Sequence, residues 1–261
     1  MEVLYGLHPV EEAIRSGSRR LDFVVVARER KDERLEGVIQ LCRSKGVRVS
    51  IEPKEQLTRL AKTDAHQGVL ALVKEREFLS IEDLMRPKAE GEYRFFLALD
   101  GVEDPHNFGA LLRTADGAGV DGVIVPERRS APVTGTVAKT SAGASEHVRI
   151  ARVTNMVRSL EQLKQKNVWV LGLDERGSPD YVDFDFKTDC VLVLGREGAG
   201  LHDLVKKTCD HLLRIPMAGM VSSLNVSVAG AVVMYEAMRQ RRAVPAPVKK
   251  SPIKERRGLG S

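Results

Sequence analysis

Short, nearly continuous apolar segments alternate with amphipathic helical patterns over the second two-thirds of the chain, and this alternation most restricts the fold. Strands that helices bury on both faces have such nearly continuous apolar sequences, so the pattern predicts an α/β domain with a mostly parallel sheet. Ligands of such sheets bind beyond the carboxyl ends of the strands, so we look for chemistry after Leu99, Leu194 and Ile215. The expected strands and helices are 95–99, 122–125, 148–151, 168–173, 191–194 and 212–215, and 108–117, 133–138 and 156–166.

The rest of the chain divides by composition. Residues 1–73 carry shorter helical and strand patterns and predict a small α/β domain, followed by a charged linker at 74–92 and the main domain at 93–242. Residues 243–261 are basic and rich in proline, so we expect a disordered tail. The tail could grip a phosphate backbone or only solubilise the chain.

Composition excludes several classes of protein. With 43% hydrophobic and 30% charged residues, the 261-residue chain is neither disordered nor fibrous. It carries no apolar run long enough for a membrane span and no signal-peptide pattern, so we expect a cytoplasmic protein without a membrane partner. Cys42, Cys190 and Cys209 are far apart and lack ligand spacing, which argues against disulfides and against a metal site.

Three segments at strand ends carry candidate functional residues. After the first long strand, Asn107 is a plausible helix cap and Arg113 lies six residues further along the same helix. After the fifth strand, Gly195 opens a G-x-x-G-x-G turn that also contains Glu197. This spacing differs from the dinucleotide-binding G-x-G-x-x-G, and the chain has no P-loop. Each segment alone could equally be a cap, a solvated charge or a flexible turn.

The third segment follows the last strand. Ile215 precedes a run in which Ser222 or Ser223 is expected to cap a helix that is poor in charge, and Ser223 and Asn225 could bind a ligand. A helix with so few charges must be buried against the sheet or against another subunit.

Taken together and in this order, N-x-G-x-x-x-R-T-A, L-G-x-E-G-x-G and I-P-M-x-G-x-x-x-S-L-N-V-S-V-A resemble the three motifs of the SpoU (TrmH) family of RNA ribose 2′-O-methyltransferases, in the SPOUT class. The resemblance covers about residues 93–242. L-Y-G-L-H-P-V at 4–10 and H-Q-G-V at 66–69 make the front domain similar to the L7Ae-like RNA-binding domain of members that modify a guanosine of large-subunit (23S) ribosomal RNA.

The resemblance implies a fold and a site. The catalytic domain would end in a trefoil knot, and S-adenosylmethionine would contact Gly195, Ile215 and Leu224. The pocket would be shared across a homodimer, and no metal would be needed. Arg113, Asn107, Glu197, Ser223 and Asn225 would be the catalytic residues, methylating the ribose of ribosomal RNA.

Within that resemblance, Arg113 is best interpreted as a charged donor that binds phosphate and stabilises the developing alkoxide, because arginine stays protonated near neutral pH. Asn107, Ser223 and Asn225 would orient the ribose and the RNA backbone, and Glu197 would fix Arg113 or the loop. Two alternatives stay open: a methyltransferase acting on transfer RNA, and a non-catalytic assembly factor that binds ribosomal RNA. Base methylation through a cysteine is disfavoured because no cysteine lies in the three segments.

Overall fold

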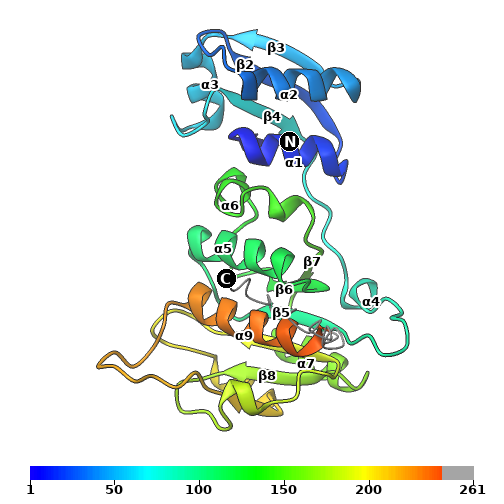
Figure 1. Cartoon of the computed structure of the whole chain (residues 1–261), viewed down its shortest axis with the longest axis vertical. Helices are drawn as coiled ribbons and strands as arrows, with labels where there is room; N and C mark the ends of the chain where they lie inside the picture. The colour runs from blue at the N-terminus through cyan, green and yellow to red at the C-terminus, as the bar shows by residue number, and fades with distance from the viewer. Residues whose placement is uncertain (243–261) are drawn as a thin grey trace, which may run out of the picture.

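The computed structural model describes residues 1–242 and shows two α/β domains stacked along the long axis of the molecule (Figure 1). The N-terminal domain is a four-stranded sheet in the order β1-β4-β2-β3, in which only β2 and β3 pair in parallel. Its elements are β1 (Glu2–Tyr5), α1 (Leu7–Ser16), β2 (Leu21–Ala27), α2 (Glu33–Ser44), β3 (Arg48–Glu52), α3 (Lys54–Ala61) and β4 (Val69–Val73).

The second domain is built on six strands that are all parallel, in the order β10-β8-β9-β5-β6-β7. The sheet expected from the apolar segments is therefore confirmed. Its elements are β5 (Phe95–Leu99), α5 (Pro105–Gly117), β6 (Gly122–Pro126), α6 (Gly135–Thr140), the 3-10 turn η1 (Ala144–Glu146), β7 (Ile150–Val153), α7 (Met156–Lys164), β8 (Trp169–Leu173), the 3-10 turn η2 (Tyr181–Asp183), β9 (Cys190–Leu194), α8 (Asp203–Thr208), β10 (His211–Leu213) and α9 (Val226–Arg241).

Two apolar cores cover the two faces of this sheet. Helices α5, α6 and α9 pack on one face, and α7 and α8 pack on the other. Part of the segment 74–92 joins the second core, because the short helix α4 (Ile81–Leu84) buries its two terminal residues there. Ser80 and Asp83 form a capping box that starts α4.

The order of the strands places the site. From β5 the chain continues to β6 and β7 on one side of the sheet, whereas β9 and β8 lie on the other side of β5. The carboxyl ends of two strands at such a change in strand order form the crevice where α/β proteins bind ligands. Asp100, directly after β5, donates its backbone N–H to the carbonyl of Leu194 at the end of β9 (2.7 Å). The loops carrying the first two motifs therefore start side by side.

The last helix, α9, is buried on one side only. Gly230 sits so close to α5 and β9 that an added Cβ would lie 2.7 Å from the side chains of Leu111 and Leu194. On its other side Val228 and Tyr235 are about half exposed. The basic tail at 243–261 lies outside the described residues, and the trefoil knot stays a prediction.

Candidate active site

A pocket of about 640 Å³ opens at the carboxyl edge of the sheet, a size that suits a small-molecule ligand. Its walls come from the loops after β8, β9 and β10 and from the start of α9. All three residues expected to hold the cofactor, Gly195, Ile215 and Leu224, line this pocket. Glu197, Ser223 and Asn225 line it as well, whereas Asn107 and Arg113 do not.

The glycine loop forms one wall and closes on itself. Arg196 and Gly200 exchange two backbone hydrogen bonds, of 3.0 and 2.9 Å. An added Cβ on Gly195 would lie 2.2 Å from the carbonyl carbon of Gly200, so no larger residue fits. Gly198 and Gly200 both have positive φ angles, of 70° and 67°. The loop therefore needs its glycines for its own closure as well as for the approach of a ligand.

Three polar side chains, one from each motif, meet beside the pocket, and two of them, Glu197 and Asn225, line it. The Nδ2 of Asn225 donates to the Oδ1 of Asn107 (3.1 Å) and lies 3.3 Å from the Oε1 of Glu197. The Nδ2 of Asn107 also donates to this Glu197 oxygen. The structure thus brings together residues that are 28 to 118 positions apart in the chain, as their positions after strands predicted.

The helix caps differ from those expected. Asp104, not Asn107, caps α5, accepting hydrogen bonds from the backbone N–H groups of His106 and Asn107 (both 3.2 Å). The proline that follows Asp104 starts the helix at residue 105, three residues before the expected start at 108. The cap of α9 is Asn225, and the prediction of Ser222 or Ser223 was wrong, because Asn225 Oδ1 accepts from the N–H of Ser227 (2.9 Å).

Arg113 stands apart from this cluster. Six residues along α5 correspond to a rotation of about 120° from Asn107 and a rise of ~9 Å, so the two side chains leave the helix in different directions. Arg113 is exposed, and within residues 1–242 its side chain makes no hydrogen bond or ion pair. Glu197 accepts hydrogen bonds from the two asparagines and makes none with Arg113. Of the two roles expected for Glu197, fixing Arg113 or fixing the loop, the contacts favour the second.

The loop after β8 is a wall of the pocket that sequence reasoning missed. Asp174 accepts a hydrogen bond from Lys206 Nζ at 2.6 Å, and both residues line the pocket. Burial raises the pKa of Asp174, but the hydrogen bonds from Lys206 and from the backbone N–H of Arg176, together with the charges of these two residues, leave the pKa below its usual value. The sequence could have indicated this loop, because the expected strand 168–173 ends at the same edge of the sheet as β5 and β9.

A buried carboxylate ties the glycine loop to the central strand. Asp100 accepts from the backbone N–H of His202 (2.8 Å) and from its Nδ1 (2.9 Å). Since His202 immediately follows the loop, this contact holds the far end of the loop against the end of β5. Nothing in the sequence pattern singled out the pair, because it joins positions about a hundred residues apart.

The lining residues suit a zwitterionic nucleoside. Apolar side chains such as Leu173, Ile215 and Leu224 can enclose a planar base, and the charged groups of Asp174 and Arg196 can meet hydroxyl, amine or carboxylate groups. The Nε atom of Arg196, a residue that lines the pocket, is buried without a hydrogen-bond partner among residues 1–242. S-adenosylmethionine has this combination of groups, and the residues present fit it.

The cysteines lie away from this chemistry. Burial raises the pKa of Cys190 and of Cys209 to about 12 and that of Cys42 to about 11. Thiols with such pKa values are protonated near neutral pH and are poor nucleophiles. Within residues 1–242 no cluster of three or more His, Cys, Asp or Glu could hold a metal ion. No helix of this described part is long and apolar enough to cross a membrane.

Comparison with known families decides the class of protein. A family model described as SpoU rRNA Methylase matches residues 94–235, more than half of the chain. The chain belongs to the SpoU rRNA methylase family. A second model, described as RNA 2′-O ribose methyltransferase substrate binding, matches residues 3–79. The SpoU resemblance and the separate substrate-binding front domain are thereby confirmed.

Relatives of this SpoU protein match both domains. The 23S rRNA (guanosine-2′-O-)-methyltransferase RlmB of Ralstonia nicotianae is 42% identical, covering 94% of this chain and 98% of that protein. The crystal structure of the SpoU methyltransferase AviRb from Streptomyces viridochromogenes with AdoMet has a TM-score of 0.76 at 26% identity, covering 92% and 90% of the two chains. An AdoMet-bound rRNA methyltransferase from Sinorhizobium meliloti also has a TM-score of 0.76 at 26% identity, covering 93% and 88%.

Proposed function

We propose that this SpoU protein transfers a methyl group from S-adenosylmethionine to the ribose 2′-hydroxyl of a guanosine in 23S ribosomal RNA. The observation that carries the proposal is the meeting of Asn107, Glu197 and Asn225 beside a ligand-sized pocket that the last two residues line. The similarity to RlmB over nearly the full length, front domain included, supports ribosomal RNA as the substrate.

Gly195, Ile215 and Leu224 hold the cofactor in this proposal. The closed glycine loop allows close approach of backbone to ligand, and the two larger residues supply apolar contact. Bound S-adenosylmethionine supplies the electrophilic methyl carbon. The protein has to place the ribose oxygen in line behind that carbon, for which rigid walls are needed.

The polar residues divide into positioning and binding groups. Asn225 uses Oδ1 to cap α9 and Nδ2 to reach Asn107 and Glu197, so these three side chains hold the three loops in register. Ser223 is exposed at the pocket wall and is free to bind the RNA backbone. Arg113 acts as the charged donor that binds phosphate and stabilises the developing alkoxide, with phosphate or water taking the proton.

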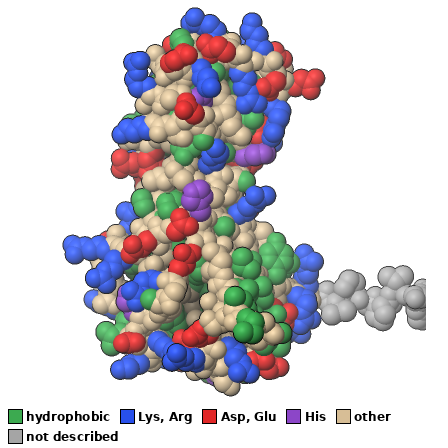
Figure 2. Space-filling view, turned by 90° about the vertical axis from the view of Figure 1, so that its left-hand side faces the viewer, with side chains coloured by type: hydrophobic (Ala, Val, Ile, Leu, Met, Phe, Trp, Pro, Cys, Tyr) green, Lys and Arg blue, Asp and Glu red, His purple; other side chains and the backbone are tan. Residues whose placement is uncertain are grey.

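A homodimer completes the site. Hydrophobic side chains gather on the surface of the second domain (Figure 2). The exposed apolar residues include Met220, Val221, Val228 and Tyr235, which belong to the third motif and α9. Burying them against a second copy would remove a large apolar patch from water. Arg113 does not line the pocket of its own subunit, and a dimer would allow it to act in the pocket of the partner subunit.

Ribosomal RNA as the substrate supports a cytoplasmic location. The experiment that tests the function is a map of 2′-O-methyl groups in RNA from cells with and without this protein. Loss of one methylguanosine of 23S rRNA is the expected result. Loss of a methyl group from transfer RNA instead would establish the alternative substrate, and an unchanged map in all RNAs would leave only a non-catalytic role.

A further inference from the structure

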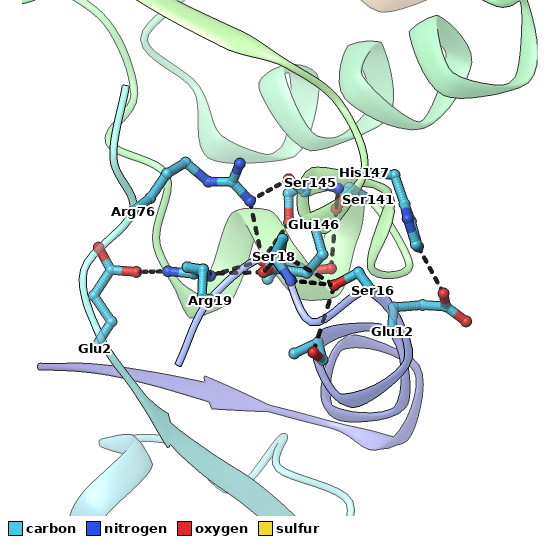
Figure 3. A network of polar contacts seen from close by, with 12 residues as sticks. Glu2, Glu12, Ser16, Ser18, Arg19, Arg76, Ser141, Ser145, Glu146 and His147 are labelled. Carbon is cyan, nitrogen blue, oxygen red and sulfur yellow. Dashed lines mark hydrogen bonds and ion pairs between the residues drawn. The ribbon is translucent and has the colours of Figure 1, made fainter. Parts of the chain in front are cut away.

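A glutamate of the second domain lies fully buried where the two domains meet (Figure 3). Glu146, at the end of η1, has a side chain that is 0% exposed. Arg19, between α1 and β2 of the N-terminal domain, donates from Nε to Oε2 (2.9 Å) and from Nη2 to Oε1 (2.7 Å). This bidentate contact fixes both the distance and the angle between the guanidinium and the carboxylate.

A second arginine binds the same carboxylate. Arg76, from the linker, has Nη2 3.3 Å from Oε1 of Glu146, and the same nitrogen donates to the backbone carbonyl of Ser145. Glu2, at the start of β1, pairs with Arg19. One carboxylate therefore joins the front domain, the linker and the second domain, and the two arginines and two glutamates balance in charge.

The surroundings of Glu146 and Arg19 favour the charged forms of both side chains. Burial raises the pKa of Glu146, but the hydrogen bonds from Arg19 and the charge of Arg76 outweigh it and hold the pKa below its ordinary value. Burial also opposes the charge of Arg19, whose pKa is nevertheless raised by Glu146 and Glu2. Because taking charges out of water is costly, the best-attested use of such a buried cluster is to fix one arrangement of the elements it joins.

Neighbouring contacts give the domain interface a defined shape. Tyr5 and Thr136 share a hydrogen bond of 2.9 Å between their hydroxyls, and Lys139 Nζ donates to the carbonyl of Ala65 at 2.7 Å. Gly135 approaches so closely that an added Cβ would lie 2.5 Å from the carbonyl oxygen of Val3. These contacts come from α6 and its flanks, on the same side of the second domain as η1.

We propose that Glu146, Arg19 and Arg76 form a clamp that fixes the front domain at one orientation to the pocket and thereby selects the nucleotide that is methylated. The inference rests on the proposed function. The pocket itself can contact only the target nucleotide and its neighbours, so the choice among similar guanosines must come from RNA held elsewhere. A front domain held rigidly fixes the distance and the orientation between the RNA that it binds and the pocket.

The test compares Glu146→Gln with a matched control in the full-length protein. Arg48→Gln is the control, because Arg48 forms an exposed ion pair with Asp22 within the front domain. Spin labels at Lys45→Cys and Lys166→Cys, exposed positions in the two domains, report the distribution of distances between the domains. Methylation is measured on 23S rRNA, with each modified nucleotide mapped, together with the affinities for S-adenosylmethionine and RNA.

The clamp predicts one narrow distance distribution in the wild type and in Arg48→Gln, and a broad one in Glu146→Gln. It also predicts that Glu146→Gln keeps both affinities, loses ~10-fold in kcat/KM at the target and modifies neighbouring nucleotides, as expected from misplacement of the reacting groups. An unchanged narrow distribution in Glu146→Gln, or a broad one with unchanged choice of nucleotide, overturns the proposal.

Two further measurements keep the outcome interpretable. If Glu146→Gln does not fold, Arg76→Gln leaves the Arg19–Glu146 contact in place and is judged by the same criteria. A uniform fall in both affinities and in turnover, with no new methylation sites, would show a purely structural role and refute the clamp. If the wild type methylates no ribosomal RNA, the proposed function fails, whereas the spin-label distances still test the rigid arrangement.

Discussion

Asn225 has two roles that can be separated by substitution. Its Oδ1 caps α9, and its Nδ2 reaches Asn107 and Glu197. In Asn225→Ser the hydroxyl can still cap the helix but cannot reach the other two residues, whereas Asn225→Ala removes both contacts. Loss of an N-cap costs about 1 kcal/mol, so the alanine variant should be less stable than the serine variant, by ~2–4 °C in thermal midpoint.

Methyl transfer should fall equally in the two variants. Each loses two hydrogen bonds at a solvent-exposed position, one of them to a carboxylate, which together are worth about 2 kcal/mol or ~30-fold in rate if they act by positioning the loops. Transfer of tritium from labelled S-adenosylmethionine to 23S rRNA measures the rate, and a thermal melt measures stability. Serine activity within a factor of about three of the wild type would refute the bridging role of Asn225.

Three more results are expected. Arg113→Ala should keep cofactor binding by calorimetry while methylation falls more than ~100-fold; near-normal turnover would remove Arg113 from the mechanism. Gly195→Ala should abolish cofactor binding in a folded protein, because its Cβ would collide with Gly200; unchanged binding in calorimetry would contradict the closed loop. The pKa of Glu146 lies below its ordinary 4.5, so its contribution to stability is present above that pH and lost as the pH falls through the folded value. Between about pH 5 and 3 the thermal midpoint of the wild type should therefore fall more steeply than that of Glu146→Gln, and parallel curves would argue against the buried ion pairs.

Much of the sheet could be predicted because its strands are buried on both faces. The expected strand 95–99 matches β5 residue for residue, since a continuous apolar segment flanked by charged or turn residues defines its own ends. β1 and α8 were not anticipated, because Glu2–Tyr5 and Asp203–Thr208 are short and mix polar with apolar residues. β1 depends on pairing with β4, and α8 depends on packing into the core of the second domain. The local sequence pattern does not encode such contacts with distant parts of the chain.

The candidate site shows the same division. The positions of Gly195, Glu197 and Asn225 after buried strands predicted that they would meet, because parallel strands end at one edge of the sheet. The identity of the caps was missed, because Asp104 and Asn225 compete with nearby Asn and Ser residues that have similar capping propensity. The clamp at Glu146 could not be predicted, since it depends on how two separately folded domains pack.

The most direct test of the account is the chemical identity of the product formed by purified full-length protein, methyl-labelled S-adenosylmethionine and 23S rRNA. Digestion to nucleosides followed by mass spectrometry is expected to give label in 2′-O-methylguanosine and nowhere else. Label on a base, or no incorporation by folded protein that binds the cofactor, would contradict the claim that the three loops hold a methyl donor against a ribose hydroxyl.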